Sequence, residues 1–280
     1  MINQLNLISG YKDGRSYLKD AFFTRPFRLA NIGSFTTDHS LQLMIMSSSP
    51  GILDGDRYDI SIQVEEQSRL LLESQSYQRL FNMQHGAEQK MTIALAPGAV
   101  FSFVQHPVVP HEQSIFKAHN TIQLSDNCQF TFGEIITCGR KHSGEVFRFS
   151  RLHNLTEIFH NGKLVLKDNI LLQPQLMAMN TLGQTEGYSH QATFIYIDTA
   201  ATEDSIEHII TGTYDYLQEE EGIDFGISQP FSSCMIIRVL GNGGEQLYDA
   251  FRHIQRKLWT VPETEELPVV VPDIAHQVQS

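Results

Sequence analysis

The sequence has few cysteines, few basic residues and no long apolar run. The three cysteines, Cys128, Cys138 and Cys234, form no C-x-x-C pair, and an odd number does not suit a disulfide framework. Among 280 residues, 20 are lysine or arginine and 32 are aspartate or glutamate, giving a formal net charge of -12. That charge argues against a nucleic-acid partner, because phosphate binding needs a basic surface.

The apolar segments are too short for a membrane protein. No run approaches the roughly 20 residues that span a bilayer. Asn, Gln, Lys and Asp interrupt the opening residues, where a signal peptide would have its apolar core. We therefore expect a soluble, cytoplasmic protein with no membrane partner.

Motifs of the common enzyme families are also absent from the sequence. It contains no G-x-x-x-x-G-K-[ST], no G-x-G-x-x-G and no G-x-S-x-G. His111-Glu112 begins like the H-E-x-x-H zinc motif, but Ile115 stands where the second histidine would be. These absences favour a protein that is not an enzyme, although catalytic groups can converge from distant segments.

Apolar and polar residues alternate over the first two thirds of the chain, which predicts strands. In residues 57–65, Tyr58, Ile60, Ile62 and Val64 fall on one face of such a strand. The same pattern predicts strands at 69–74, 90–96, 100–104, 121–124, 129–132 and 145–152. Asn161-Gly162 separates two further strands at 156–160 and 163–167, and predicts a tight hairpin because both turn positions need positive φ.

Two helices are expected late in the chain. Ile206, Ile209, Ile210, Tyr214 and Leu217 keep helical spacing between Thr202, a suitable N-cap, and Gly222, with fraying expected at Glu219–Glu221. A second apolar stripe predicts a helix from about Glu245 to Trp259.

The expected fold is mainly β, a large solenoid- or sandwich-like scaffold of many strands with both helices packed on it. No fixed-period sequence repeat decides between solenoid and sandwich. We expect one β-rich domain over residues 1–262 and an extended or disordered tail over 263–280.

Histidines and one cysteine are weak candidates for metal binding. Imidazole and thiolate are ligands for nickel or zinc, and the candidates are His106, His111, His119, Cys138 and His142. An alternative hypothesis is thus a divalent-metal-dependent hydrolase that uses the His106–His119 region with Asp56, which requires three or more ligands around one ion. Solvated loop histidines, and a buried thiol at Cys138, explain the same residues without a metal.

Carboxylates offer a second kind of site. Asp54, Asp56 and Asp59 crowd one segment, and Glu134 and Glu145 bracket the loop that contains Cys138. Such groups can act as general acid and base, or line a path for a hydrated cation. Asp59 alternates with Tyr58 and Ile60, and therefore belongs to the wet face of a strand.

Seven segments, in order, resemble the urease accessory proteins of the UreD (UreH) family. The resemblance covers roughly residues 20–260 and is carried by SPGILDGDRYDISI (49–62), SQSYQRLF (74–81), APGAVFSFVQHPVVPHEQSIF (96–116), GEIITCGRKHSGEVFRF (133–149), NGKLVLKDNILLQP (161–174), CMIIRVLGN (234–242) and KLW (257–259). The chain departs from the family at Ile52 and Asp54, where glycines are usual, and at Cys138, where a proline is common.

The resemblance implies a maturation chaperone that helps to insert nickel into urease. UreD proteins bind UreF, which recruits the GTPase UreG, and the assembly docks on apo-urease; nickel is thought to pass through a tunnel in UreD, which hydrolyses nothing. The resemblance implies transient nickel(II), no tightly bound cofactor, and allows a homodimer within the accessory complex. A metal-free β scaffold for protein binding remains a further alternative.

The family pattern also assigns roles to individual residues of this chain. It implies that three carboxylates lie nearest the nickel path: Asp56, Glu134 and Glu145. It implies that three further residues shape the protein or contact partners: Gln75, Arg79 and Arg140.

Overall fold

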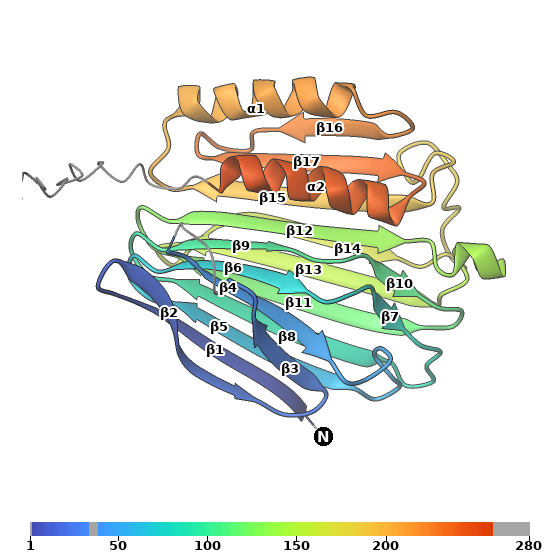
Figure 1. Cartoon of the computed structure of the whole chain (residues 1–280). Helices are drawn as coiled ribbons and strands as arrows, with labels where there is room; N and C mark the ends of the chain where they lie inside the picture. The colour runs from blue at the N-terminus through green and yellow to red at the C-terminus, as the bar shows by residue number, and fades with distance from the viewer. Residues whose placement is uncertain (1, 34–38, 260–280) are drawn as a thin grey trace, which may run out of the picture.

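Two large β-sheets face each other in the computed structural model, which describes residues 2–33 and 39–259 (Figure 1). One sheet has the strand order β14-β13-β11-β8-β5-β1-β2. Its strands are β1 (Ile2–Lys12), β2 (Arg15–Phe23), β5 (Arg57–Val64), β8 (Ala87–Leu95), β11 (Ile115–Leu124), β13 (Arg151–His160) and β14 (Lys163–Leu172).

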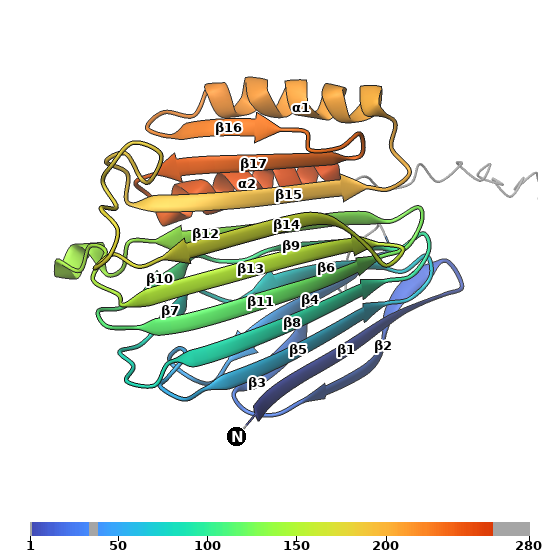
Figure 2. The ribbon, with the colours of Figure 1, turned by 180° about the vertical axis from the view of Figure 1, so that it is seen from behind.

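The second sheet has the order β16-β17-β15-β12-β9-β6-β4-β3, with β10 and β7 attached beside β12. Its strands are β3 (Phe27–Asn31), β4 (Leu41–Ser47), β6 (Arg69–Ser74), β7 (Gln78–Leu80), β9 (Val100–Val104), β10 (Val108–Pro110), β12 (Gln129–Thr137), β15 (His190–Asp198), β16 (Asp224–Ser228) and β17 (Cys234–Gly241). In Figure 2 the first sheet is in front, and both helices lie at the end of the second sheet that contains β15, β16 and β17.

The chain coils between the two sheets, so the fold is both solenoid and sandwich. It visits them alternately from β4 to β13, and successive visits to one sheet pair in parallel, as in β4-β6-β9-β12 and β5-β8-β11-β13. The strands β4, β6, β9 and β12 begin at Leu41, Arg69, Val100 and Gln129, so one turn takes about 30 residues. The expectation of a mainly β fold with two late helices is confirmed.

Apolar side chains stack in rows between the sheets. Ile62, Ile93, Ile122 and Ile158 are cross-strand neighbours in β5, β8, β11 and β13, and each is fully buried. From the opposite sheet, Phe101 and Phe130 stack with ring centroids 5.9 Å apart. Burying one such side chain contributes about 1.5–3 kcal/mol, which makes these rows the main support of the coil.

The helices cover the second sheet at one end of the molecule (Figure 1). Thr202 caps α1 (Glu203–Gln218) by accepting a hydrogen bond from the Ser205 amide, as predicted, and the acidic run at Glu219–Glu221 lies beyond the helix. The second helix, α2 (Gly244–Leu258), packs Phe251 edge-on against Phe194 of β15 at 5.2 Å. In the described part of the chain, neither helix has the length and apolarity needed to cross a membrane.

Most predicted strands are confirmed, but the one over 145–152 is wrong. An irregular stretch that follows the 3-10 turn η1 (Lys141–Ser143) occupies most of this segment, and β13 begins only at Arg151. Phe147 has a φ of 53° and its amide donates to the Cys138 carbonyl, which turns the chain so that Phe149 is fully buried. The alternation of apolar and polar residues in this segment therefore reflects the turn and not a strand. The expected tail at 263–280 lies outside the described residues.

The hairpin prediction is confirmed. Asn161 and Gly162 have φ angles of 49° and 77° and join β13 to β14. Both values fall in the left-handed region that a two-residue hairpin turn requires.

Candidate functional site

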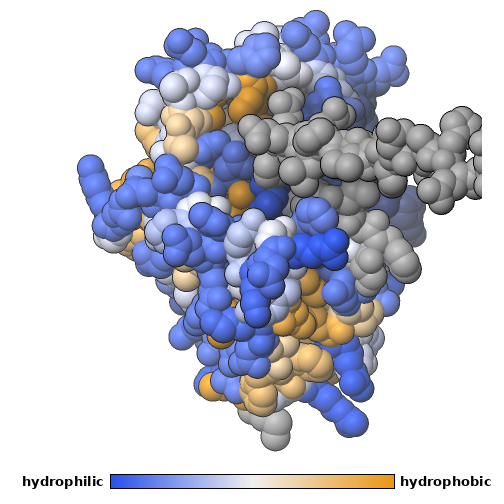
Figure 3. All heavy atoms as spheres, turned by 60° about the vertical axis from the view of Figure 1, so that its left-hand side comes forward, coloured by the Kyte–Doolittle hydropathy of each residue, from blue (hydrophilic) through white to orange (hydrophobic). Residues whose placement is uncertain are grey.

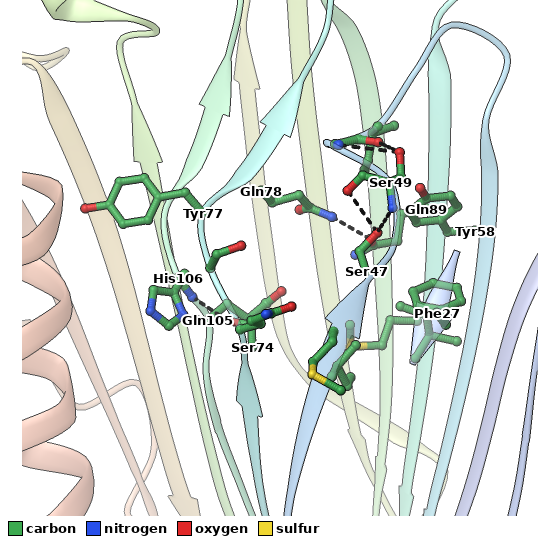
Figure 4. A pocket seen from close by; sticks show the side chains of 18 of the residues that line it. Phe27, Ser47, Ser49, Tyr58, Ser74, Tyr77, Gln78, Gln89, Gln105 and His106 are labelled. Atoms are coloured by element: carbon green, nitrogen blue, oxygen red, sulfur yellow. Dashed lines mark hydrogen bonds between the residues drawn. The ribbon is translucent and has the colours of Figure 1, made fainter. Parts of the chain in front are cut away.

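A cavity of about 130 Å³ opens between the sheets beside β4 and β6 (Figure 4). Polar side chains line its mouth and its inner end: Ser47, Ser49, Gln75, Tyr77, Gln78, Gln89 and Gln105. The Gln78 amide donates to Gln89 Oε1 at 3.3 Å, which joins β7 in one sheet to β8 in the other. These amides and hydroxyls share the cavity wall with apolar side chains such as Ile45, Met91 and Phe103.

A second, deeper cavity continues from the first. It has a volume of about 20 Å³ and shares Gln78, Gln89, Gln105 and His106 with the outer one. A space of this size holds about one water molecule. Its far wall includes Glu134 and Asn154, so the polar lining reaches the middle of the sandwich.

The register of the strands explains why there is space here. Gln89, Ala118 and Asn154 are cross-strand neighbours in β8, β11 and β13, and all three face inward. The small side chain of Ala118 lies between two longer polar ones and lines the inner cavity. The inner cavity therefore results from Ala118, the small residue in a row whose other members are larger.

Glu134 is the most unusual residue of this interior. Asn154 donates to its Oε2 at 2.7 Å, and Asn120 donates to its Oε1 at 3.3 Å. Burial raises the pKa of Glu134 to about 7, against the opposing effect of these hydrogen bonds, and the nearby Asp168 carboxylate raises it further. A carboxyl group with this pKa can exchange a proton for a cation near neutral pH.

Polar side chains continue past Glu134 to the opposite surface. Across the second sheet, Glu134 neighbours Thr193, and Thr193 neighbours Arg238. Arg238 donates to Thr193 Oγ1 at 3.0 Å and to Asp168 Oδ1, on β14 of the first sheet, at 2.5 Å. Arg238 is half exposed at a surface hollow of about 410 Å³.

We name this row of residues the polar seam. It comprises Gln78, Gln89, Gln105, Asn120, Glu134, Asn154, Thr156, Asp168, Thr193 and Arg238. Burying so many polar groups costs free energy unless each is paired, and the hydrogen bonds above supply most of that pairing. The seam crosses the sandwich from the mouth near β4 to the hollow near β17.

The other two predicted carboxylates lie outside the seam. Asp56 accepts a hydrogen bond from the Leu53 amide at 2.8 Å and closes the turn before β5. Glu145 forms an ion pair with Arg140 and accepts a bond from the Glu112 amide at 3.1 Å. The structure therefore places Glu134 alone of the three in the interior, and gives Asp56 and Glu145 local structural partners.

The candidate metal-binding side chains point to different places. His106 stacks on Tyr248 at 4.1 Å, His111 packs against Phe81, and His119 pairs with Glu157 on the outer face of the first sheet. Among residues 2–33 and 39–259, no group of three or more His, Cys, Asp or Glu side chains is placed to hold a metal ion. The hydrolase hypothesis thus has no ligand set in this part of the chain.

The Cys138 thiol and His142 do not form a pair either. Cys138 is fully buried, and burial raises the pKa of its thiol, which disfavours the thiolate that binds metal. His142 is exposed in η1.

Arg79 and Arg140, predicted to shape the protein or contact partners, share one surface groove. It has a volume of about 630 Å³ and lies where β7, β10, η1 and the start of α2 meet; we call it the α2 groove. His111 and His142 also line it, whereas Gln75 lies at the mouth of the seam.

The loop that departs from the family pattern is held by close backbone contact. A Cβ on Gly51 would lie 2.4 Å from the Arg79 carbonyl oxygen, so only glycine fits. Ile52 is buried and bridges to Leu80, and the Asp54 side chain accepts bonds from the His85 and Gly86 amides. Ile52 and Asp54, which stand where the family usually has glycine, are therefore held by contacts of their own.

Comparison with known proteins agrees with these features. A family model described as "UreD urease accessory protein" matches residues 3–275. The chain is 65% identical over 275 residues to the urease accessory protein UreD of Flavobacterium johnsoniae, covering 98% of this chain and 99% of that one. It is 30% identical to UreD of Acetivibrio thermocellus, covering 92% and 97%, and 31% identical to UreH of Helicobacter pylori strain P12, covering 88% and 89%. With a family match over nearly its whole length and relatives that share its full extent, this chain belongs to the UreD family of urease accessory proteins.

Proposed function

We propose that this urease accessory protein passes nickel(II) ions through the polar seam to apo-urease, within an assembly with UreF and UreG. The observation that carries the proposal is Glu134, a carboxyl group held by two asparagines in the middle of a β-sandwich. An apolar residue at this position would stabilise the core without the cost of burying a carboxyl group. The presence of Glu134 therefore supports a functional role for this residue. Oxygen and nitrogen ligands of this kind suit a divalent nickel ion.

The seam suits passage better than storage. Its donors are single carboxylates and amides spread over successive strands, and the described residues bring no three strong ligands together. Because the inner cavity holds about one water, a nickel ion would have to exchange much of its water shell for seam oxygens. Glu134, with a pKa of about 7, would accept the cation as its proton leaves.

Exposed apolar side chains support a role in protein assembly. Tyr17, Leu18, Phe22 and Phe23 on the edge strand β2 are exposed, and Figure 3 shows apolar surface gathered on the lower part of this side of the molecule. Leu182, in the segment between β14 and β15, is 90% exposed. Surfaces of this kind mark sites of protein contact. In this proposal the protein acts in the cytoplasm and catalyses no reaction itself.

Two variants test the path. Glu134→Gln removes the seam's central charge, and Ala118→Leu fills the inner cavity. Urease is produced with all its accessory proteins, purified, and assayed for nickel per active site and for activity, while co-purification of the accessory proteins reports assembly. Both variants are expected to assemble normally and to give nickel-poor urease.

A matched control separates the path from general charge loss. Glu88→Gln removes a carboxylate from the exposed face of β8, one position from Gln89, and is expected to leave nickel loading unchanged. Full nickel loading with both Glu134→Gln and Ala118→Leu would refute the seam as the path and would favour a metal-free scaffold.

A further inference from the structure

The α2 groove collects positive charge on an acidic protein. Three cationic side chains line it, Arg79, Arg140 and Lys141, against one carboxylate, Glu245. The protein as a whole carries a net charge of -12. The excess of cations in this groove is therefore a local arrangement, opposite in sign to the rest of the molecule.

The charges are only partly neutralised within the chain. Arg140 pairs with Glu145, and Lys141 Nζ donates to Ser189 Oγ at 3.1 Å. Arg79 is exposed and has no ion pair among the described residues. The Tyr77 hydroxyl donates to Glu245 Oε2 at 2.9 Å, which holds that carboxylate to one side.

The loop that carries Arg140 and Lys141 is fixed. A Cβ on Gly139 would lie 2.8 Å from the Glu145 carbonyl and 2.9 Å from the Pro110 carbonyl, at a φ of 118°. The turn that follows is closed by the Lys141 and Ser143 amides. Both cations are therefore presented by a backbone that is already in place.

The amino-terminal end of α2 opens into the same groove. Its N-cap, Gly243, has no side chain to accept the first amides, and Gly243, Gly244 and Glu245 all line the groove. The unpaired amides and partial positive charge of a helix start favour an anion. Figure 1 shows the start of α2 at the same end of the molecule as η1.

A buried histidine supplies an independent indication of a ligand. His111 lines the groove and is only 6% exposed, yet its Nε2 has no hydrogen-bond partner among the described residues. Leaving a buried polar nitrogen unpaired is costly, and such atoms are rare in folded proteins. Because this nitrogen is itself buried, a ligand oxygen in the groove would pair with it only after the imidazole ring turns toward the groove.

We propose that the α2 groove binds a carboxylate of an acidic segment of a partner protein. Arg79 and Lys141 would take the charge, and the α2 amides and His111 Nε2 would donate to the oxygens. A peptide fits better than a small anion, because the groove is about 630 Å³ in volume and Tyr77, Phe81 and Val109 add apolar walls for neighbouring side chains. The inference extends the partner-contact role expected of Arg79 and Arg140.

Direct binding to the full-length protein tests this inference. A fluorescein-labelled tetraglutamate peptide is titrated by anisotropy at low and at high salt, with inorganic phosphate as competitor. The peptide is expected to bind at low salt. Arg79→Glu and Lys141→Glu should each weaken binding by about tenfold or more, since each replaces a charge-assisted bond with repulsion.

The control is Lys90→Glu, which makes the same charge change on the exposed face of β8. It is expected to leave the peptide affinity within about twofold of the parent value. Absence of binding, or equal losses in Lys90→Glu and Arg79→Glu, would overturn the proposal. Phosphate that binds as tightly as the peptide would assign the groove to small anions instead. No nickel is used, so failure here leaves the seam proposal standing.

Discussion

Replacing Glu134 by glutamine should stabilise the protein at alkaline pH and remove part of its pH dependence. Raising the pKa of this carboxyl group from its ordinary 4.5 to about 7 corresponds to about 3 kcal/mol, at about 1.4 kcal/mol per pH unit. Below pH 4.5 the group is protonated in folded and unfolded chains alike, and costs nothing. As pH rises through about 7, the folded chain bears the full cost of a buried charge.

Glutamine keeps the shape and one acceptor, and the facing asparagine amides can turn to accept from its new donor. Urea denaturation measures the free energy of unfolding of both proteins at about pH 4.5 and about pH 8. The difference between Glu134→Gln and the parent should grow in favour of the variant by up to about 3 kcal/mol over that range. Because the two proteins share all other titrating groups, an unchanged difference across the range would refute the assignment of a raised pKa to Glu134.

Three further changes test separate parts of the structure by thermal or urea unfolding. Asp168→Asn removes the carboxylate that holds Arg238 across the sheets. It should lower the free energy of unfolding by only about 1 kcal/mol, since Arg238 is half exposed and solvent screens the ion pair. A loss above about 3 kcal/mol would mean that solvent screens the pair far less than its exposure indicates. Gly51→Ala places a Cβ against the Arg79 carbonyl and should cost about 1–3 kcal/mol, whereas a neutral result would show that the turn shifts freely. Thr202→Ala removes the N-cap of α1 and should cost about 1 kcal/mol, seen also as lost helical circular dichroism; an unchanged midpoint would show that solvent replaces the cap.

The strands were predictable where one face is buried and the other is wet. In β5 the residues Tyr58, Ile60, Ile62 and Val64 are buried, as their alternation predicts. The alternation at 145–149 failed because local contacts of Phe147 and Phe149, not a strand, bury those rings. The pairing of each strand with its neighbours depends on how the loops carry the chain between sheets, which no short-range pattern specifies.

The interior site was only partly predictable. Glu134 was found through the family pattern, but its partners were missed. A signal for them is present in the strands themselves: Asn120, Asn154 and Thr156 occupy inward positions of β11 and β13 that the alternation reserves for apolar side chains. The link from Asp168 to Arg238 spans 70 residues and two sheets, so only the folded chain reveals it.

The coil also sets a distance scale for whatever moves through its interior. Neighbouring strands lie about 4.8 Å apart, so polar groups on successive turns are spaced by that step. In the proposed path, a cation would move between polar groups of successive turns, which share the cavity walls with apolar side chains such as Phe103, Phe116 and Leu152. Adding or deleting one turn would lengthen or shorten this route by one such step. The number of turns therefore sets the length of the route through the protein.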